Sequence, residues 1–311
     1  MVVEHLGKIV VLGGINMDLV AATHRIPGPG ETVIGTEFRT TPGGKGANQA
    51  VAACRLGAKV TMVGRVGSDP FGTELVDNLA ETGVNIEHVH TDPSTPSGVA
   101  IILLDEHQQN FIIGVYGANM QLDDRELDAV RIELSDADVL MIQMETPVEL
   151  SLKAAAIAKD FGVRVVMDPA PPSRLSQSSY RLAGIVTPNQ SEAEVLTGVV
   201  VTEPTSAKTA ARVLVDLGAK VAIVKIGELG VVYATNDTVE HIAAYTVDSI
   251  DTVGAGDAFA GGVAVALAEG ETVGDAVRFG AAAGAIAVTK IGAQDSMPYR
   301  AEVDDLLFAT R

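Results

Sequence analysis

The segment DTVGAGDAF, residues 251–259, places an acid among small residues where a helix is expected to begin. Amides in a first helical turn lack helical partners and the helix dipole favours negative charge there, so Gly254, Ala255 and Gly256 can form an anion hole. Asp257 follows directly, and we expect it to act as a general base. It would orient a substrate hydroxyl and take its proton late, as loose phosphoryl transfer permits. The alternative is a carboxylate that only stabilises the helix start.

A second glycine-rich segment, PGGKGANQA, covers residues 42–50. It is not a Walker A loop, because Lys45 is followed by Gly46 instead of serine or threonine. Gly44 permits close backbone approach, and Lys45 and Asn48 are expected to donate hydrogen bonds to a polyol. The alternative is a plain strand–turn–helix corner with a solvated lysine.

Polar side chains also follow several expected strands, where ligands bind in open α/β sheets. Carboxylates and amides there can exchange hydrogen bonds with sugar hydroxyls, although turn formation explains some of them equally well. Glu192 is expected to hold water on Mg²⁺, with a capping-box role as its alternative. The residues at these strand ends are Asn16, Asp18, Glu145, Asn189 and Gly227.

The elements that must position these residues alternate between strand and helix after residue 122, which indicates parallel βαβ units with helices on both faces. We expect a first strand at 9–12, another at 59–67, and helices at 47–56, 70–82, 147–161, 192–196 and 205–217. Three more helices are expected to begin near 256, 272 and 301, and hairpins turn near 106–109 and 236–237. The segments at about 17–42 and 97–116 are β-prone and interrupted, so one domain, 1–311, with a small β insert is predicted.

Composition excludes several classes of protein. The 311 residues hold 22 basic and 40 acidic side chains, a net charge of −18, which argues against nucleic acid or an anionic membrane as a partner. No apolar run is long enough to span a bilayer, and the N-terminus does not resemble a signal peptide. The single cysteine, Cys54, is expected in a helix core and fits a reducing cytoplasm. The six histidines show no metal-ligand spacing and are expected at the surface.

The two glycine-rich motifs, in this order, resemble the signatures of the ribokinase family of carbohydrate kinases, the PfkB-type group. GAN at 117–119 and KIGAQDSMP at 290–298 add to the resemblance, which covers nearly the whole chain. It implies a three-layer αβα sandwich with a mainly parallel central sheet and a small β-sheet lid that forms a homodimer contact. It also implies ATP-dependent phosphorylation of the ribose 5-hydroxyl, giving ribose 5-phosphate and ADP, with Asp257 as the base.

The resemblance implies ligand sets as well. The sugar would be held by Asn16, Asp18, Gly44, Lys45, Asn48 and Glu145. ATP and Mg²⁺ would lie near Asn189, Glu192, Gly227, Gly230 and Gly256. A K⁺ activator would bind at Asp251, Val253, Ala287, Gly292 and Ser296. Lys225 departs from the family, which more often has a small hydroxyl residue there, and it would supply positive charge for ATP.

Other hypotheses stay open at this point. A kinase of the same family acting on deoxyribose, another sugar or a nucleoside fits the same motifs, although 4% aromatic content mildly favours a bare sugar. A catalytically silent sugar- or nucleotide-binding protein is the alternative from another class. A dinucleotide-dependent oxidoreductase is disfavoured because GGINMD lacks the required glycine spacing.

Overall fold

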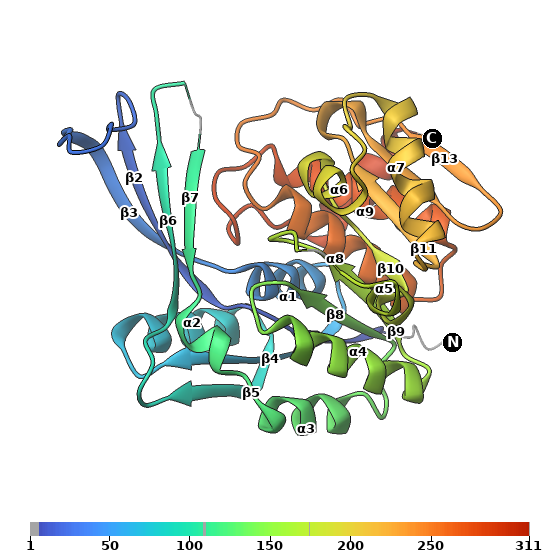
Figure 1. Cartoon of the computed structure of the whole chain (residues 1–311), viewed down its shortest axis with the longest axis horizontal. Coiled ribbons are helices and arrows are strands. Elements are labelled where there is room, and N and C mark those ends of the chain that lie inside the picture. Colours follow the sequence, from blue (N-terminus) through green and yellow to red (C-terminus); the bar gives the residue numbers. More distant parts are fainter. Residues whose placement is uncertain (1–5, 108–109, 174, 311) are drawn as a thin grey trace.

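A nine-stranded sheet forms the centre of the computed structural model, which describes residues 6–107, 110–173 and 175–310 (Figure 1). Its order is β13-β12-β11-β10-β9-β8-β1-β4-β5, and neighbouring strands pair in parallel except for the antiparallel pairs β11–β12 and β12–β13. The strands are β1 (Lys8–Leu12), β4 (Lys59–Gly67), β5 (Asn85–Asp92), β8 (Val139–Gln143), β9 (Arg164–Asp168), β10 (Ile185–Val186), β11 (Val221–Lys225), β12 (Val231–Ala234) and β13 (Val239–Ile242).

Helices cover both faces of this sheet, and each face has its own hydrophobic core. One layer contains α1 (Lys45–Arg55), α2 (Pro70–Glu81), α8 (Ala255–Ala268) and α9 (Val273–Ala287), with α10 (Arg300–Ala309) packed on α9. The other contains α3 (Asp124–Glu133), α4 (Val148–Phe161), α5 (Gln177–Ala183), α6 (Gln190–Thr197) and α7 (Pro204–Asp216). The predicted three-layer α/β class is therefore confirmed.

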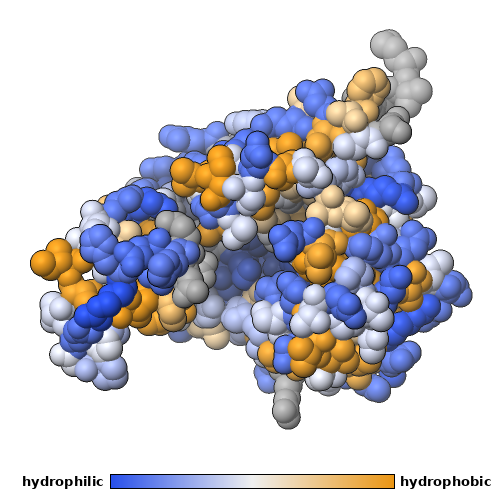
Figure 2. All heavy atoms as spheres, turned by 90° about the horizontal axis from the view of Figure 1, so that it is seen from above, coloured by the Kyte–Doolittle hydropathy of each residue, from blue (hydrophilic) through white to orange (hydrophobic). Residues whose placement is uncertain are grey.

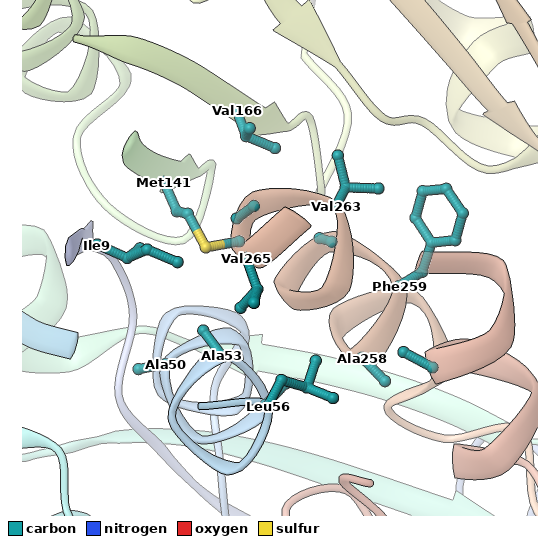
Figure 3. Close-up of a cluster of buried hydrophobic side chains, with 14 of the residues drawn as sticks. Ile9, Ala50, Ala53, Leu56, Met141, Val166, Ala258, Phe259, Val263 and Val265 are labelled. Carbon is teal, nitrogen blue, oxygen red and sulfur yellow. The ribbon is translucent and has the colours of Figure 1, made fainter. Parts of the chain in front are cut away.

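Helix α8 is buried from Asp257 to Ala268, as its uniformly apolar sequence predicts. Phe259 and Val263 lie in a cluster that also contains Met141 of β8 (Figure 3). A Cβ added to Gly280 of α9 would lie 2.7 Å from the carbonyl oxygen of Phe259, so only glycine permits this approach of α9. Close packing of this kind fixes the position of the α8 N-terminus, where Asp257 lies.

A second sheet of four strands, the lid sheet, stands beside the main body (Figure 1). Its order is β3-β2-β6-β7, formed by β2 (Asn16–Thr23), β3 (Gly35–Gly43), β6 (Gly98–Leu104) and β7 (Asn110–Val115). The β2–β3 and β6–β7 pairs are antiparallel, whereas β2 and β6 pair in parallel. The predicted hairpin therefore forms, but residues 108 and 109 of its expected turn lie outside the described chain.

One strand, β5, and two α-helices, α3 and α5, were not anticipated from the sequence. Helix α3 carries a detectable signal, since Asp123 and Glu126 form a capping box at its start. In the stretches that the structure describes, no helix is long and apolar enough to cross a membrane.

The expectation that all histidines lie at the surface is wrong for two of them. His88 and His90 of β5 are partly buried, because they contact the carboxylates of Glu133 and Glu126 on α3 at 3.1 and 2.9 Å. His5 lies outside the described residues. Cys54, expected in a core, is half-buried at the end of α1.

Candidate active site

The N-terminus of α8 has the geometry expected of an anion hole. Gly254 caps the helix in the left-handed region, with φ 77°, and no side chain caps the first turn. The amide of Ala255 lies 3.4 Å from the carbonyl of Thr252, a long hydrogen bond that leaves this donor weakly used. Lys225 faces the same turn, since its Nζ lies 3.4 Å from where a Cβ on Gly256 would stand.

Asp257 is buried in the first turn of α8 and is held by two amides of α1. Asn48 Nδ2 donates to Oδ2 at 2.9 Å, and Gln49 Nε2 donates to Oδ1 at 3.0 Å. Burial raises the pKa of Asp257, although Lys45 opposes the rise. A carboxylate with a raised pKa accepts a proton more readily than an ordinary aspartate, which suits a general base.

The start of α1 lies against Asn16, the first residue of β2, and against Glu145, which follows β8. Gly44 has φ 90°, and a Cβ there would lie 2.6 Å from the backbone nitrogen of Asn16. Glu145 Oε2 accepts hydrogen bonds from the Lys45 amide at 2.8 Å and from Asn16 Nδ2 at 3.1 Å. The predicted residues of three separate segments are thus brought into direct contact.

Asn119 belongs to this arrangement but was not recognised as a site residue. Its Nδ2 donates to Asn16 Oδ1 at 2.7 Å and to the carbonyl of Ile15 at 3.0 Å, and its Oδ1 accepts from the amide of Ile15. Asn119 is fully buried and therefore fixes the amide orientation of Asn16.

Acceptors for a ligand remain among these residues. The side chain of Asp18 receives no hydrogen bond from the described part of the chain, and Asn48 Oδ1 is buried without a partner. Burial raises the pKa of Asp18 to about 7, with a further contribution from Asp257. Burial also raises the pKa of Glu145 to about 7, against the opposing effect of Lys45. Unpartnered buried acceptors are costly unless a ligand satisfies them.

Asp168 is a second buried carboxylate of the site, which sequence reasoning missed. Lys225 Nζ lies 3.1 Å from its Oδ1, Lys45 Nζ lies 3.8 Å from its Oδ2, and Gln49 also donates to Oδ2 at 3.1 Å. Burial opposes its ionisation, but the two lysines outweigh burial and hold the pKa below the usual range. The available signal was its position as the last residue of β9, the same strand-end logic that found Glu145.

Lys45 lies among the acids of the site. Burial lowers its pKa, but Asp257, Asp168 and Glu145 outweigh burial and hold the pKa above the ordinary lysine value. Lys45 therefore stays charged, and the reading of a merely solvated lysine does not hold.

Asn189 and Glu192 lie at the start of α6, beyond the end of β10. Asn189 is the N-cap, and the Glu192 carboxylate accepts from its backbone amide at 2.7 Å and its Nδ2 at 2.9 Å. The capping-box alternative therefore describes the geometry of Glu192. Burial raises the pKa of this carboxyl, as does Asp168. An isolated β-bridge joins Asn189 to Lys225. This end of α6 therefore lies beside Asp168 and its lysine partners.

The two predicted nucleotide glycines lie in the turn between β11 and β12. Gly227 has φ 60° and stands beside Gln190 of α6. Gly230 has φ 97°, and a Cβ there would lie 2.1 Å from the carbonyl oxygen of Ile242. Packing against the strand end therefore suffices to explain Gly230.

Within the described ranges, no three histidine, cysteine or acidic side chains gather closely enough to hold a metal ion. Mg²⁺ usually keeps several waters and binds through one or two carboxylates plus substrate phosphates. The Glu192 carboxylate fits that mode, because each of its oxygens retains a lone pair beyond its bond to Asn189.

The predicted cation residues lie behind the α8 N-terminus. Asp251 joins two loops, since Oδ1 accepts from the Val253 amide and Oδ2 from the Gly292 amide, both at 3.0 Å. Buried Ser296 donates to the carbonyl of Ala293 at 2.8 Å, and the carbonyl of Ala287 accepts from the Lys290 amide at 3.1 Å. The structure brings the two loops together around Asp251.

Seen from above, a hollow with a hydrophilic floor lies between the lid sheet and the main body (Figure 2). The sequence profile of the pfkB family carbohydrate kinases matches residues 6–300. The chain belongs to the pfkB family of carbohydrate kinases.

Relatives of this pfkB-family chain match along almost their full length. It is 41% identical to a ribokinase of Haemophilus influenzae over 299 residues, 96% of this chain and 98% of the relative. It is 37% identical to a deoxyribokinase of Salmonella typhi over 291 residues, 93% of this chain and 95% of the relative. The solved structure of Arabidopsis thaliana ribokinase complexed with ribose and ATP superposes with a TM-score of 0.88, at 32% identity and with 97% and 98% coverage.

The family assignment confirms the predicted class of enzyme. The protein is a sugar kinase, a phosphotransferase with an alcohol group as acceptor. Of the predicted sugar residues, the structure joins Asn16, Lys45 and Glu145 by hydrogen bonds, and links Asn48 to Asp257. The role of each residue stays a prediction.

Proposed function

We propose that the protein transfers the γ-phosphoryl group of ATP to the 5-hydroxyl of D-ribose. The observation that carries this proposal is the position of Asp257, a buried carboxylate in the first turn of α8, beside amides that no side chain caps and next to unpartnered acceptors for hydroxyl groups. The ribokinase relatives support the choice of sugar.

The sugar would lie between the lid sheet and α1. Asp18 and Asn48 Oδ1 would accept hydrogen bonds from ring hydroxyls, and Glu145 would keep Asn16 and the Lys45 amide in place. Gly44 lets the start of α1 approach the backbone at Asn16, so its own backbone would lie beside the sugar. Satisfying buried acceptors in this way favours a polyol over an apolar ligand.

Asp257 would orient the 5-hydroxyl and accept its proton as the phosphoryl group transfers. The amides of Gly254, Ala255 and Gly256 would stabilise charge on the transferred group, as donors aimed at a developing charge do in other enzymes. Because the transition state is loose, positioning contributes more than the basicity of the carboxylate.

Lys225 would supply a positive charge for the ATP phosphates. Its Nζ lies between Asp168 and the turn at Gly256, so a phosphate in that turn would come within its reach. Asn189, Gly227 and Gly230 would lie beside the nucleotide. Glu192 would hold Mg²⁺ through water, and the ion when bound would neutralise charge on the phosphates.

A monovalent cation such as K⁺ would bind behind the anion hole and stabilise its loops. Asp251 offers a carboxylate and Ser296 a hydroxyl, and the carbonyls of Val253, Ala287 and Gly292 would complete an oxygen set. Asp251 already links the loop at Val253 to the loop at Gly292. Cation binding there would therefore influence the amides at residues 254–256.

The outer face of the lid sheet would form a homodimer. Side chains alternate between the two faces of a strand, and the face opposite Asp18 carries five apolar residues that are more than a third exposed. They are Phe38, Ile101, Phe111, Ile113 and Val115. An apolar face of this size on a soluble kinase favours association.

The test is a panel of acceptors assayed for ADP release with ATP and Mg²⁺: ribose, deoxyribose, fructose, ketodeoxygluconate and adenosine. We expect the highest kcat/KM with ribose. A higher value with deoxyribose would support the second candidate, for which the Salmonella relative is the reason. No release with any acceptor would favour a silent binding protein.

A further inference from the structure

Gln49 lies at the centre of the site, yet no role in the reaction follows from its type alone. It belongs to α1 and is fully buried. Its Nε2 donates to Asp257 Oδ1 at 3.0 Å and to Asp168 Oδ2 at 3.1 Å. Because an amide group has two N–H bonds, one hydrogen serves each of the two buried carboxylates.

Gln143 fixes the orientation of the Gln49 amide. Its Nε2 donates to Gln49 Oε1 at 2.6 Å from the end of β8, and it is itself fully buried. A reversed amide would direct the Gln49 oxygen at two carboxylates and leave two NH₂ groups facing each other. Gln49 therefore has one orientation, with its donors toward the acids.

The position of α1 makes this bridge rigid. A Cβ on Gly261 of α8 would lie 2.8 Å from Cβ of Ala52, so the two helices approach closely. Two consecutive α1 residues, Asn48 and Gln49, thereby each hold one oxygen of Asp257. Both oxygens of the carboxylate are fixed, and its plane is set before a sugar arrives.

We propose that Gln49 is a positioning residue for phosphoryl transfer, which fixes the carboxylate plane of Asp257 and bridges it to Asp168. The inference rests on the proposed function, in which Asp257 receives the hydroxyl proton. Gln49 acts through Asp257 and does not itself contact the sugar. A carboxylate whose lone pair is misdirected by even a small rotation loses the near-attack geometry on which the rate depends.

The same contact affects when Asp257 is ionised. A donor hydrogen bond favours the charged form of a carboxylate, so Gln49 opposes the rise in the Asp257 pKa that burial causes. The charged groups that face Asp257 from the surrounding elements keep their places when only Gln49 is changed. They are Asp18 of β2, Lys45 of α1, Glu145 after β8, Asp168 of β9 and Lys225 of β11.

The test is Gln49→Met, which keeps an unbranched side chain of similar length but removes both donors. We expect kcat to fall about tenfold to a hundredfold, while KM for the sugar changes by less than about threefold, because no sugar contact is removed. We expect the acid limb of the kcat–pH profile to move up by about one unit, since the ionised carboxylate has lost a donor. Loss of packing alone would not move that limb.

Thr61→Val is the matched control. It removes a partly buried hydrogen bond, from Thr61 Oγ1 to Glu133 at 3.2 Å, at the far side of the sheet. It should lower the unfolding temperature without moving the pH profile. If Gln49→Met fails to fold, Gln143→Met takes its place; it loosens the Gln49 amide without removing its donors, so a smaller shift in the same direction and a loss of about threefold to tenfold are expected.

Two results would overturn the inference: an unmoved acid limb in the variant that folds, or a loss of kcat/KM that lies wholly in KM. Failure of the proposed function is distinguishable, because the unsubstituted protein would then release no ADP with any acceptor.

Discussion

Asp18→Asn is expected to stabilise the fold above neutral pH while it weakens sugar phosphorylation. Asp18 is buried among other acids, and its pKa rises from 3.8 to about 7 in the folded chain. Between these values the folded state binds a proton that the unfolded state has lost, so stability falls as the pH rises from about 4 to about 7. The free-energy cost of ionising Asp18 in the folded chain is absent below this pH window and complete above it.

The magnitude follows from the shift. A difference of about 3 units corresponds to about 4 kcal/mol at pH 8, at 1.4 kcal/mol per unit. At pH 5 only about the first pH unit above the unfolded-state pKa contributes, so the cost is about 1.6 kcal/mol. Asparagine removes the titration, so its stabilising effect should be about 2–3 kcal/mol larger at pH 8 than at pH 5. For a chain of 311 residues that is a difference of about 4 °C in Tm.

Thermal unfolding of both proteins at pH 5 and pH 8, without ligands, measures this effect. Asp128→Asn serves as the control, because Asp128 is an exposed acid of α3 and should shift Tm equally at both pH values. A gain from Asp18→Asn that is the same at pH 5 and pH 8, or absent at pH 8, would refute the electrostatic reasoning. We also expect KM for ribose to rise, since a carboxylate accepts more strongly than an amide.

Further predictions concern the other parts of the site. Asp257→Asn should fold and bind ATP but lose about 10²- to 10⁴-fold in kcat, and near-normal turnover would exclude it as the base. Lys225→Met should raise KM for ATP more than KM for sugar, and unchanged ATP affinity would remove Lys225 from the phosphate site. The same variant should lower Tm, because Asp168 then keeps a single lysine partner, at 3.8 Å. Activity should be higher in K⁺ than in a bulky organic cation, and equal rates would contradict the cation site. Ile113→Asp should give monomers by light scattering, whereas Ile112→Asp, equally exposed at 58% on the other face, should not; identical behaviour of the two would exclude the lid dimer.

The sequence predicted the fold class because its signals are local. Apolar runs of strand length, helix starts such as Asp69-Pro70 and the regular alternation after residue 122 each report on neighbouring residues. β5 was missed because it alternates weakly at the sheet edge, and α5 because its Pro-rich surroundings conceal seven helical residues. The parallel β2–β6 pairing depends on residues some eighty positions apart, and no local pattern encodes it.

The sequence by itself determined the chemistry available to this protein: an acid after a glycine-rich turn, a lysine after another, and polar residues at strand ends. Tertiary structure alone decided which of these groups meet. Asn48 and Gln49 reach Asp257 across more than two hundred residues, and Asp168 joins Lys45 and Lys225 from three different elements. The physical reason is that parallel strands end at one edge of a sheet, so groups distant in sequence share one buried volume. In that volume, burial and neighbouring charges both act on the pKa of each group.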